Sequence, residues 1–160
     1  MSHWIMATVL VLSNMAWGLN NSFEISVLPV FSAKTIEGEN IDYRVLSNGG
    51  VVTFFRSGCG YCLLEFPMWQ KIRKTFPELM MILVTHNEAN WRVSQFLIHH
   101  GNPFNYVIDD GHAVLWRMFG ASQTPETFLI NNHSEVIGHF GYLGKDSQVL
   151  LTNIKSGLET

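Results

Sequence analysis

The chain has two cysteines, Cys59 and Cys62, which stand three positions apart at the junction of two different sequence patterns. Before them, residues 51–55 read Val-Val-Thr-Phe-Phe, an apolar run rich in strand-forming residues that predicts a buried central strand. After them, residues 60–76 carry apolar side chains at spacings of three or four, which predicts a helix. A buried strand that leads directly into a helix is half of a β-α-β unit, so this junction predicts an α/β fold.

The same alternation of strand and helix patterns continues to the end of the chain. Short apolar runs predict strands at 79–85, 104–108, 127–130 and 135–140. Helical periodicity and end signals predict helices at 88–100, 111–119 and 145–154. A tight turn at Asn131-Asn132-His133 makes the last two strands an antiparallel hairpin, while the helical connections between the earlier strands favour parallel pairing. Core candidates in the second helix are Trp91, Phe96 and Leu97.

Before the central strand, Glu37-Gly38-Glu39-Asn40 predicts a turn between two short extended pieces, which together would form a small β-hairpin. Residues 23–32 alternate weakly and contain Pro29, which suits an edge strand or an extended lead-in. We find no internal repeat, low-complexity tract or linker, and therefore expect one domain over residues 22–160. Its expected architecture is a central mixed sheet flanked by helices, with an N-terminal β-hairpin extension.

Composition excludes several classes of protein and partner. Apolar residues make up 47% of the 160 residues and charged residues 14%, which indicates a folded domain with a sizeable core. The formal net charge is −3 and no run of Lys or Arg occurs, so nucleic acid is not an expected partner. The chain has neither a Cys-x-x-Cys-His motif nor a phosphate-cradling glycine-rich loop, and we expect no haem, flavin, nucleotide or other cofactor.

Residues 1–18 have the pattern of an export signal peptide. Residues 4–12 form a short apolar core, and Ala16-Trp17-Gly18 fits the small-x-small rule for cleavage. Only His3 could supply positive charge before the core, so an uncleaved anchor and a buried N-terminal strand stay open as alternatives. No apolar run approaches the roughly 20 residues of a membrane span, and membrane association is expected only if this segment is retained. We therefore expect a protein of the periplasm or of another exported location.

The position of the two cysteines favours redox chemistry. Cys59 would lie at the amino end of the predicted helix, where unpaired N–H groups and the helix dipole stabilise a thiolate. Cys62 would lie one turn further on, close enough to form a disulfide with Cys59. In that arrangement Cys59 attacks the disulfide of a partner protein, and Cys62 resolves the mixed disulfide that forms.

Two other interpretations of the cysteines stay open. A Cys-x-x-Cys segment can supply half of a zinc site, but zinc takes four ligands and the chain has no second such segment. Histidines could complete a site only if the fold happened to bring them there, so we expect no metal. The two thiols could also be inert core residues.

Two segments of the chain resemble the TlpA/DsbE-like redoxins, thioredoxin-fold proteins of which many act on cytochrome c maturation in the bacterial periplasm. Residues 54–67 resemble the active-site stretch of that family, and its common pattern Cys-x-x-Cys-x-x-Glu-x-Pro is matched at Cys59, Cys62, Glu65 and Pro67. Residues 124–130, Thr-Pro-Glu-Thr-Phe-Leu-Ile, resemble the family's cis-proline loop and the strand after it. The resemblance covers residues 27–145 and implies the thioredoxin fold.

The resemblance also implies roles for individual residues. Pro125 would be cis, with its loop facing the cysteines and the backbone of Thr124 pairing with a bound partner strand. Without the resemblance, Pro125 indicates only a turn before a strand. In similar proteins the acid at position 65 tunes the cysteine pKa values and relays a proton, whereas the alternative for Glu65 is an exposed helix residue. Tyr61, by its place between the cysteines, is the best candidate for contact with a partner.

Three positions depart from the family pattern. Gly58 stands where the family usually has Trp, which removes a flat apolar surface beside the active site. Thr53 stands where thioredoxin has an acid and the redoxins often have Asn, so a buried acid of the thioredoxin type is absent. The dipeptide Gly60-Tyr61 resembles that of DsbC-type periplasmic isomerases rather than that of most cytochrome-maturation reductases. Because this dipeptide helps to set the redox potential, the direction of electron flow is open.

Three functions are consistent with these patterns. The first is an exported thiol–disulfide oxidoreductase that reduces protein disulfides in the manner of cytochrome c maturation and is recharged by an upstream thiol–disulfide partner. The second is a periplasmic disulfide isomerase or oxidase that assists the folding of secreted proteins. The third is a non-catalytic thioredoxin-fold binding module.

Two clusters of polar residues outside the motifs have structural explanations. His99-His100 ends a predicted helix, where a favourable charge at the helix C-terminus is a better interpretation than a metal pair. Asp109-Asp110 follows a strand and precedes Gly111, which favours a turn and helix cap over a cation site.

Overall fold

The computed structural model describes residues 25–144 and 148–158. Its strands are β1 (Ser32–Lys34), β2 (Asn40–Asp42), β3 (Gly50–Phe55), β4 (Met81–Thr85), β5 (Tyr106–Asp109), β6 (Glu126–Ile130) and β7 (Val136–Phe140). Its helices are α1 (Gly60–Thr75), α2 (Asn90–His100), α3 (Val114–Met118) and α4 (Gln148–Leu158), with the 3-10 helix η1 (Tyr43–Leu46) before β3. This order confirms the alternation predicted from the sequence. The predicted export signal, residues 1–18, lies outside the described residues.

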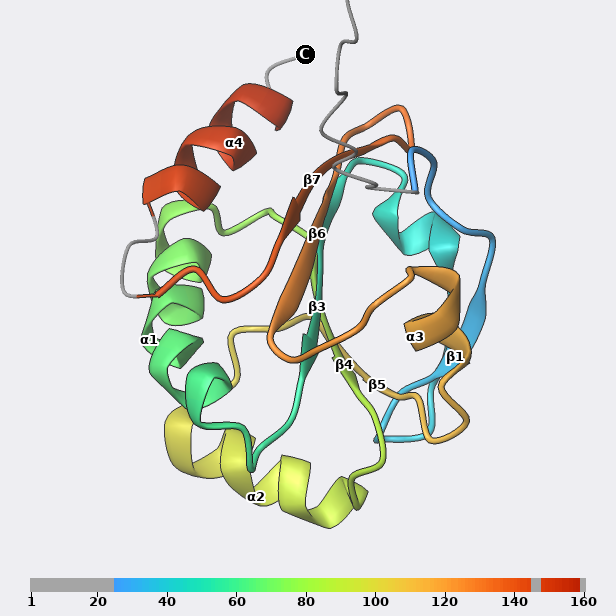
Figure 1. The fold of residues 1–160 in the computed structure, drawn as a ribbon, viewed down its shortest axis with the longest axis vertical. Helices are drawn as coiled ribbons and strands as arrows, with labels where there is room; N and C mark the ends of the chain where they lie inside the picture. Colours follow the sequence, from blue (N-terminus) through green and yellow to red (C-terminus); the bar gives the residue numbers. More distant parts are fainter. Residues whose placement is uncertain (1–24, 145–147, 159–160) are drawn as a thin grey trace, which may run out of the picture.

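The central sheet has the strand order β5-β4-β3-β6-β7, so β3 is its middle strand (Figure 1). β3 runs parallel to β4, and β4 runs parallel to β5. β6 runs antiparallel to β3 on its other side, and β7 is antiparallel to β6. The sheet is therefore mixed, as predicted, and the fold is thioredoxin-like. The predicted hairpin is also present, because β1 and β2 form a separate antiparallel pair.

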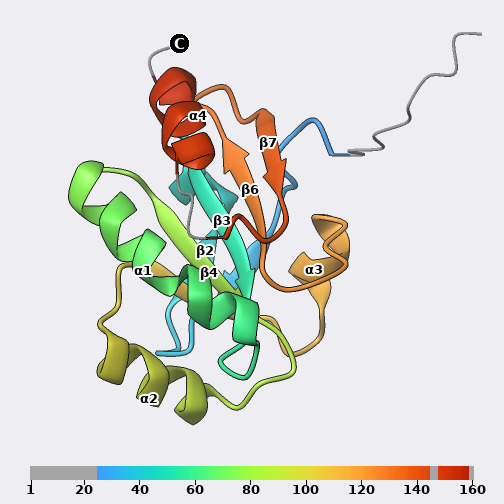
Figure 2. The same ribbon diagram turned by 60° about the vertical axis from the view of Figure 1, so that its left-hand side comes forward.

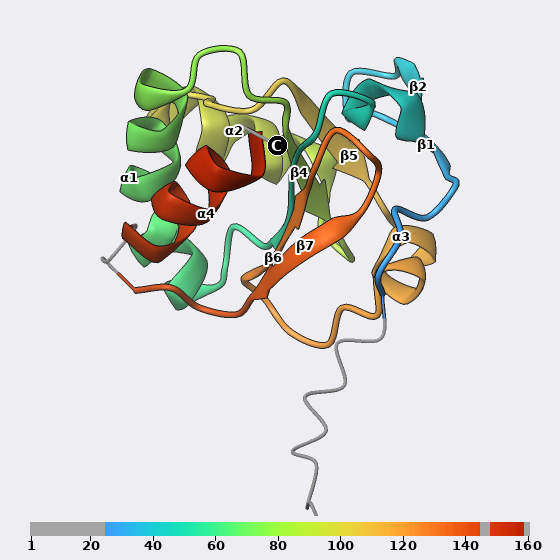
Figure 3. The ribbon, with the colours of Figure 1, turned by 90° about the horizontal axis from the view of Figure 1, so that it is seen from above.

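Both faces of the sheet are covered, but by different elements (Figure 3). α1, α2 and α4 pack on one face, and α3, η1 and the β1–β2 hairpin pack on the other. The last two residues of β3 show how one strand serves both layers, because successive strand side chains point to opposite faces. Phe55 contacts Phe66 of α1 and Phe96 of α2, whereas Phe54 contacts Trp116 of α3 and Phe128 of β6.

The prediction that Trp91 belongs to the core is wrong, because its side chain is 65% exposed. Phe96 and Leu97 are buried as predicted, and they share the inner face of α2 with Val93. Trp91 lies two positions before Val93, which is about 200° around a helix of 3.6 residues per turn. It therefore points away from the sheet.

The ends of several elements differ from their predicted ends. α3 begins at Val114 rather than at residue 111, because the buried Asp110 carboxylate accepts hydrogen bonds from the N–H groups of Val114, Leu115 and Trp116. The helix-cap interpretation of Asp110 is thereby confirmed. The lead-in before β1 is extended, with a single bridge between Val27 and Glu135. In the described part of the chain, no helix combines the length and the apolarity needed to cross a membrane.

Candidate active site

Cys59 lies at the junction where β3 ends and α1 begins, and α1 then runs back across the face of the sheet (Figure 2). Cys59 is the N-cap residue of α1, and its sulfur accepts a hydrogen bond from the Cys62 N–H at 3.3 Å. This is the position predicted for it, in which a helix amino terminus favours negative charge on sulfur. Both cysteines are free thiols.

The two thiols have different environments. Cys59 is partly exposed, whereas the Cys62 side chain is buried at 1% exposure. Partial burial raises the pKa of Cys59, but its hydrogen bonds with Cys62, Thr124 and the Tyr61 backbone outweigh burial, so the pKa lies below the ordinary value. Burial and the hydrogen bond to Cys59 raise the pKa of Cys62 to about 12. Cys59 is therefore the thiol that can react as a thiolate, and Cys62 keeps its proton.

The loop that joins β3 to α1 is held by a carboxylate from the next helix. Glu88, just before α2, accepts hydrogen bonds from the Ser57 N–H at 2.9 and 3.2 Å and from the Ser57 hydroxyl. Within the loop, the Cys59 N–H donates to the Arg56 carbonyl at 3.0 Å. These contacts set the direction in which α1 starts and hence the position of Cys59.

The loop before β6 approaches Cys59 from the other side. The Thr124–Pro125 peptide bond is cis, as the resemblance implied, and the Cys59 thiol donates to the Thr124 carbonyl oxygen at 3.3 Å. The fold thus brings Thr124 and Pro125 together with the cysteines.

Glu126 holds this loop in place, a role that the sequence motifs do not reveal. The Glu126 carboxylate is buried; one oxygen accepts from the N–H groups of Ser122 and Gln123 at 2.7 and 3.1 Å. Its other oxygen lies 2.5 Å from His139 Nε2 on β7. One feature of the sequence could have indicated this role: Glu126 is a carboxylate at the start of an otherwise apolar strand. A charged group buried at such a place needs hydrogen-bond partners.

Glu65 is a buried residue of α1, at 1% exposure, so the alternative of an exposed helix glutamate is wrong. One carboxylate oxygen accepts a hydrogen bond from the Leu143 N–H, and the other has no hydrogen-bond partner among the described residues. Burial raises the pKa of Glu65 to about 7, against the lowering effect of the Leu143 bond. It lies one helical turn beyond Cys62, a spacing that places side chains on the same helix face. A carboxyl with this pKa gains and loses protons near neutral pH.

Tyr61 lies on the outer surface beside Cys59, with 60% of its side chain exposed. Its ring packs against that of Tyr142, with 4.7 Å between the ring centres. Leu64 is also exposed on the same helix end. These three side chains form an apolar rim beside the cysteines, which we call the tyrosine rim. By contrast, the nearby aromatic residues Trp69 and Phe55 are buried in the core and take no part in this rim.

Thr53 places a neutral hydroxyl, hydrogen-bonded to a second hydroxyl, in the core beneath the site. The Thr127 hydroxyl donates to the Thr53 hydroxyl at 2.9 Å across the β3–β6 pairing. Both residues are buried. A neutral hydrogen bond therefore stands where a thioredoxin would carry an acid.

No three His, Cys, Asp or Glu side chains come close enough to bind a metal ion within residues 25–144 and 148–158. His100 packs on Phe96, and its Nδ1 is within 2.9 Å of the Phe96 carbonyl. Asp109 accepts hydrogen bonds from the Gly111 N–H and from Asn90. The polar clusters noted in the sequence thus have structural partners.

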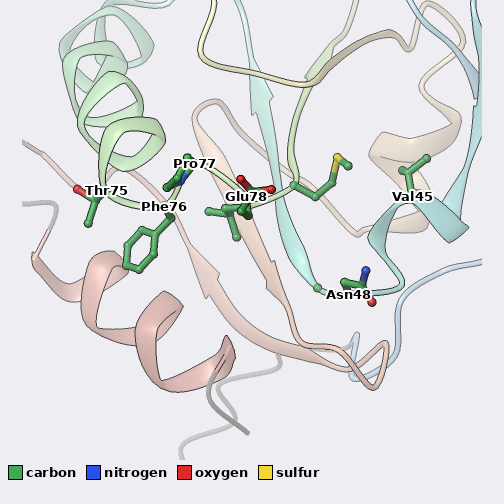
Figure 4. A pocket seen from close by; sticks show the side chains of 9 residues that line it. Val45, Asn48, Thr75, Phe76, Pro77 and Glu78 are labelled. Carbon is green, nitrogen blue, oxygen red and sulfur yellow. The ribbon is translucent and has the colours of Figure 1, made fainter.

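A separate hollow lies at the opposite end of the sheet from the cysteines (Figure 4). It has a volume of about 520 Å³ and lies between the end of α1 and the loop before β3. Thr75, Phe76 and Pro77 form one wall, and Val45 and Asn48 form the other. None of the site residues predicted from the sequence lines it.

Comparison with known proteins identifies a family and several relatives. The model of the AhpC/TSA family matches residues 26–139. "Thiol-disulfide oxidoreductase ResA" of Halalkalibacterium halodurans is 34% identical over 110 residues, which are 67% of this chain and 62% of that protein. "Sporulation thiol-disulfide oxidoreductase A" of Bacillus subtilis is 28% identical over 115 residues, which are 69% of this chain and 70% of that protein. The chain therefore spans less than two thirds of the ResA relative.

Solved structures show the same fold. The structure of MTB DsbF superposes with a TM-score of 0.69 at 25% identity, covering 80% of this chain and 94% of that one. A thiol:disulfide interchange protein from Chlorobium tepidum, described as a thioredoxin family protein, gives a TM-score of 0.72 at 21% identity. That match covers 84% of this chain and 97% of the other. The comparison confirms the thioredoxin-like fold.

Proposed function

This chain belongs to the AhpC/TSA family, and from that premise we propose that it is a thiol–disulfide oxidoreductase acting on protein disulfides through Cys59 and Cys62. One observation carries the proposal: a partly exposed Cys59 thiol with a lowered pKa lies 3.3 Å from the Thr124 carbonyl, one turn before a buried Cys62 thiol. Relatives named thiol-disulfide oxidoreductases support the same activity.

In the first step, the Cys59 thiolate attacks one sulfur of the partner's disulfide. A bond forms between Cys59 and that sulfur, the partner's S–S bond breaks, and its second sulfur leaves as a thiolate that takes up a proton. The backbone of Thr124, in the loop with Pro125, pairs with the partner strand and brings the disulfide to Cys59. Tyr61 and the rest of the tyrosine rim supply apolar contact to the partner.

In the second step, Cys62 loses its proton and attacks the Cys59 sulfur. The Cys59–Cys62 disulfide forms, the bond between Cys59 and the partner breaks, and the partner's sulfur leaves as a thiolate that takes up a proton. With its pKa raised to about 12, Cys62 needs a group that accepts its proton. Glu65 is suited to this role because its pKa is about 7 and it has one oxygen without a partner.

We propose that the protein works as a reductant of the cytochrome c maturation type and is recharged by an upstream thiol–disulfide partner. The TlpA/DsbE-like motifs support this direction. The Gly60-Tyr61 dipeptide favours the second candidate, a periplasmic isomerase or oxidase.

The equilibrium redox potential of Cys59 and Cys62 separates these candidates. We would titrate the protein with glutathione and dithiothreitol buffers and follow the fraction oxidised. A value near −270 mV or below, as for thioredoxin, supports the reductant, whereas a value near −120 mV, as for DsbA, supports the oxidant or isomerase. The absence of any reversible disulfide would leave only a non-catalytic binding module.

We further propose that residues 1–18 direct export, with cleavage after Gly18. The chain would be expressed in a Gram-negative host, and the N-terminus of the protein in the periplasmic fraction would be sequenced. An N-terminus at Leu19 supports cleavage. Recovery of the uncleaved chain in membranes would instead support an anchor.

A further inference from the structure

A second feature beside Cys59 is a polar pocket on the side away from the cis-proline loop. It has a volume of about 270 Å³ and lies between the β3–α1 loop and the start of α2, which face each other in Figure 1. The β3–α1 loop supplies Arg56, Ser57 and Gly58, and the other wall is formed by Asn87, Glu88, Ala89, Trp91 and Arg92. Gly58 directly precedes Cys59, so the pocket begins one residue along the chain from the reacting cysteine.

Gly58 helps to keep this pocket open. A β-carbon placed on Gly58 would meet no atom within 4 Å, so the space beside this residue is free. The volume is below the roughly 300–1,000 Å³ of pockets that hold drug-sized ligands, which suits a side chain rather than a cofactor.

The charges in the pocket indicate the kind of side chain. Arg56 and Arg92 line it, and neither forms an ion pair with a carboxylate of the described residues. Glu88 is the acid of the lining, but its carboxylate is engaged by the N–H and hydroxyl of Ser57. The formal charge of the lining is therefore +1, with two guanidinium groups free to bind an anion.

The Trp91 ring helps to hold the Arg92 guanidinium in place. The guanidinium carbon of Arg92 lies 5.3 Å from the centre of the Trp91 ring, within the range of a cation–π contact. Trp91 is itself exposed, and it lines the same pocket. An exposed tryptophan and two arginines that form no ion pair with the described carboxylates are typical of a surface that binds a partner.

We propose that this pocket is a subsite for an acidic side chain of the partner protein, close in sequence to the cysteine that Cys59 attacks. The inference rests on the proposed oxidoreductase function and deepens it by naming a substrate class. The carboxylate would bind Arg56 and Arg92 while the partner cysteine lies at Cys59 and its backbone at Thr124.

The test uses the reduced full-length protein and three capped peptides, Gly-Xaa-Cys-Xaa-Gly, in which Xaa is Glu, Gln or Lys. Each peptide is joined through its cysteine to 4-thiopyridine, a neutral leaving group whose release is followed by absorbance. Dividing each rate by the rate with dithiothreitol removes differences in intrinsic reactivity. Placing Xaa on both sides of the cysteine covers either direction of the partner chain.

For the unmodified protein at low salt, we expect the Glu peptide to react about three to ten times faster than the Gln peptide, and the Lys peptide to react slowest. This preference should shrink in 0.5 M salt, because exposed charges are screened. Arg56→Gln and Arg92→Gln should each reduce the Glu-to-Gln ratio, and the double variant should bring it to about one. Gly58→Trp, which fills the pocket, should do the same.

Lys71→Gln is the matched control, because it removes a cation of α1 about 18 Å along the helix from Cys59, at 1.5 Å per residue. It should keep the ratio of the unmodified protein. Equal rates for the three peptides, or a ratio that survives in the Arg56→Gln/Arg92→Gln variant, would overturn the subsite while leaving the oxidoreductase function in place. No reaction above that of a Cys59→Ser variant would overturn both.

Discussion

The Thr124 carbonyl oxygen lies 3.3 Å from the Cys59 sulfur, although 65 positions separate the two residues in the chain. This contact joins the loop before β6 to the start of α1. A partner strand that pairs with the Thr124 backbone would thus have its disulfide beside Cys59. The relationship explains why we place substrate binding and nucleophilic attack at one site, and several predictions depend on it.

The two cysteines should differ sharply when each is replaced by serine. Cys59→Ser should lower the rate of disulfide reduction by at least about 1,000-fold, because the nucleophile is lost. Cys62→Ser should still react but stop at the mixed disulfide, because the resolving thiol is missing. Intact-protein mass spectrometry would detect the covalent adduct in Cys62→Ser and its loss on treatment with dithiothreitol.

Reaction at Cys62 in the Cys59→Ser variant would contradict the assignment of Cys59 as the attacking thiol. An adduct that forms on Cys62 in the Cys59→Ser variant, as fast as on Cys59 in the converse variant, would mean that the exposed and buried thiols do not have the proposed roles. The Cys59→Ser/Cys62→Ser variant serves as the control for reaction at other residues.

Glu126 should matter for both stability and rate because it holds the cis-proline loop. Glu126→Ala leaves the Ser122 and Gln123 N–H groups without their acceptor, which should lower the free energy of unfolding by about 2–4 kcal/mol. The loop that carries Thr124 should also shift, so that mixed-disulfide formation slows. Urea denaturation and the peptide assay measure the two effects.

Glu126→Gln provides the matched comparison. Its amide oxygen can still accept from the two N–H groups, so most of the stability and rate should be restored. If Glu126→Ala lost stability but kept the full rate with a peptide disulfide, Glu126 would have no role in positioning the Thr124 loop.

Much of this fold could be predicted from the sequence because local patterns decided it. The apolar run at 51–55 and the helical periodicity of 60–76 placed Cys59 at a helix start with no knowledge of the rest of the chain. The failure at Trp91 has a physical cause, since an aromatic residue near a helix start can point either to the sheet or to solvent. The spacing in the sequence gives the angle between Trp91 and Val93, but packing decides which of the two residues faces the sheet.

The site was only partly accessible to sequence reasoning. The family resemblance indicated that Thr124 and Pro125 belong to the site. No pattern in the sequence predicts that the Glu126 carboxylate binds Ser122, Gln123 and His139. The pocket with Arg56 and Arg92 was equally hidden, because it is formed by two loops about 30 positions apart that Glu88 and Ser57 join. Long-range contacts of this kind have no periodicity in the sequence.

Tyr61 should affect reaction with proteins more than reaction with small disulfides. Tyr61→Ala removes an exposed ring from the tyrosine rim, and the rate with a folded disulfide protein should fall about three- to tenfold. The rate with a small neutral disulfide should change less than about twofold, because that reagent does not span the rim. Stopped-flow measurement of both reactions gives the two ratios.

Ile98→Ala is the control for the loss of exposed apolar area, because Ile98 is 77% exposed on α2. It should alter neither rate. Equal slowing of both substrates by Tyr61→Ala would indicate an effect on Cys59 itself and would argue against partner contact.

Glu65 should make stability depend on pH in a known direction. Its pKa is raised from about 4.5 to about 7 on folding, so the folded protein binds the proton more tightly than the unfolded chain. The contribution of protonated Glu65 to the free energy of unfolding is fully present below about pH 4.5. It is lost as pH rises through about 7. The loss is at most about 3 kcal/mol. Glu65→Gln should remove this dependence, and Glu78→Gln, an exposed control, should keep it in urea denaturation at pH 5 and pH 8.

The same carboxyl should control the second chemical step. Once the mixed disulfide has formed on Cys59, release of the partner requires that Cys62 give up its proton, and ionised Glu65 is the proposed acceptor. The rate of this step should therefore rise with pH through about 7 and level off when Glu65 is ionised.

In Glu65→Gln the inflection near pH 7 should disappear, and the release step at pH 7.5 should slow about 10- to 100-fold. At higher pH the rate should recover, because hydroxide can remove the Cys62 proton without Glu65. Single-turnover release from a preformed mixed disulfide, between pH 5 and pH 10, isolates this step from the attack by Cys59. If Glu65→Gln kept the inflection near pH 7, a group other than Glu65 would take the proton, and the buried carboxyl would have only a structural role.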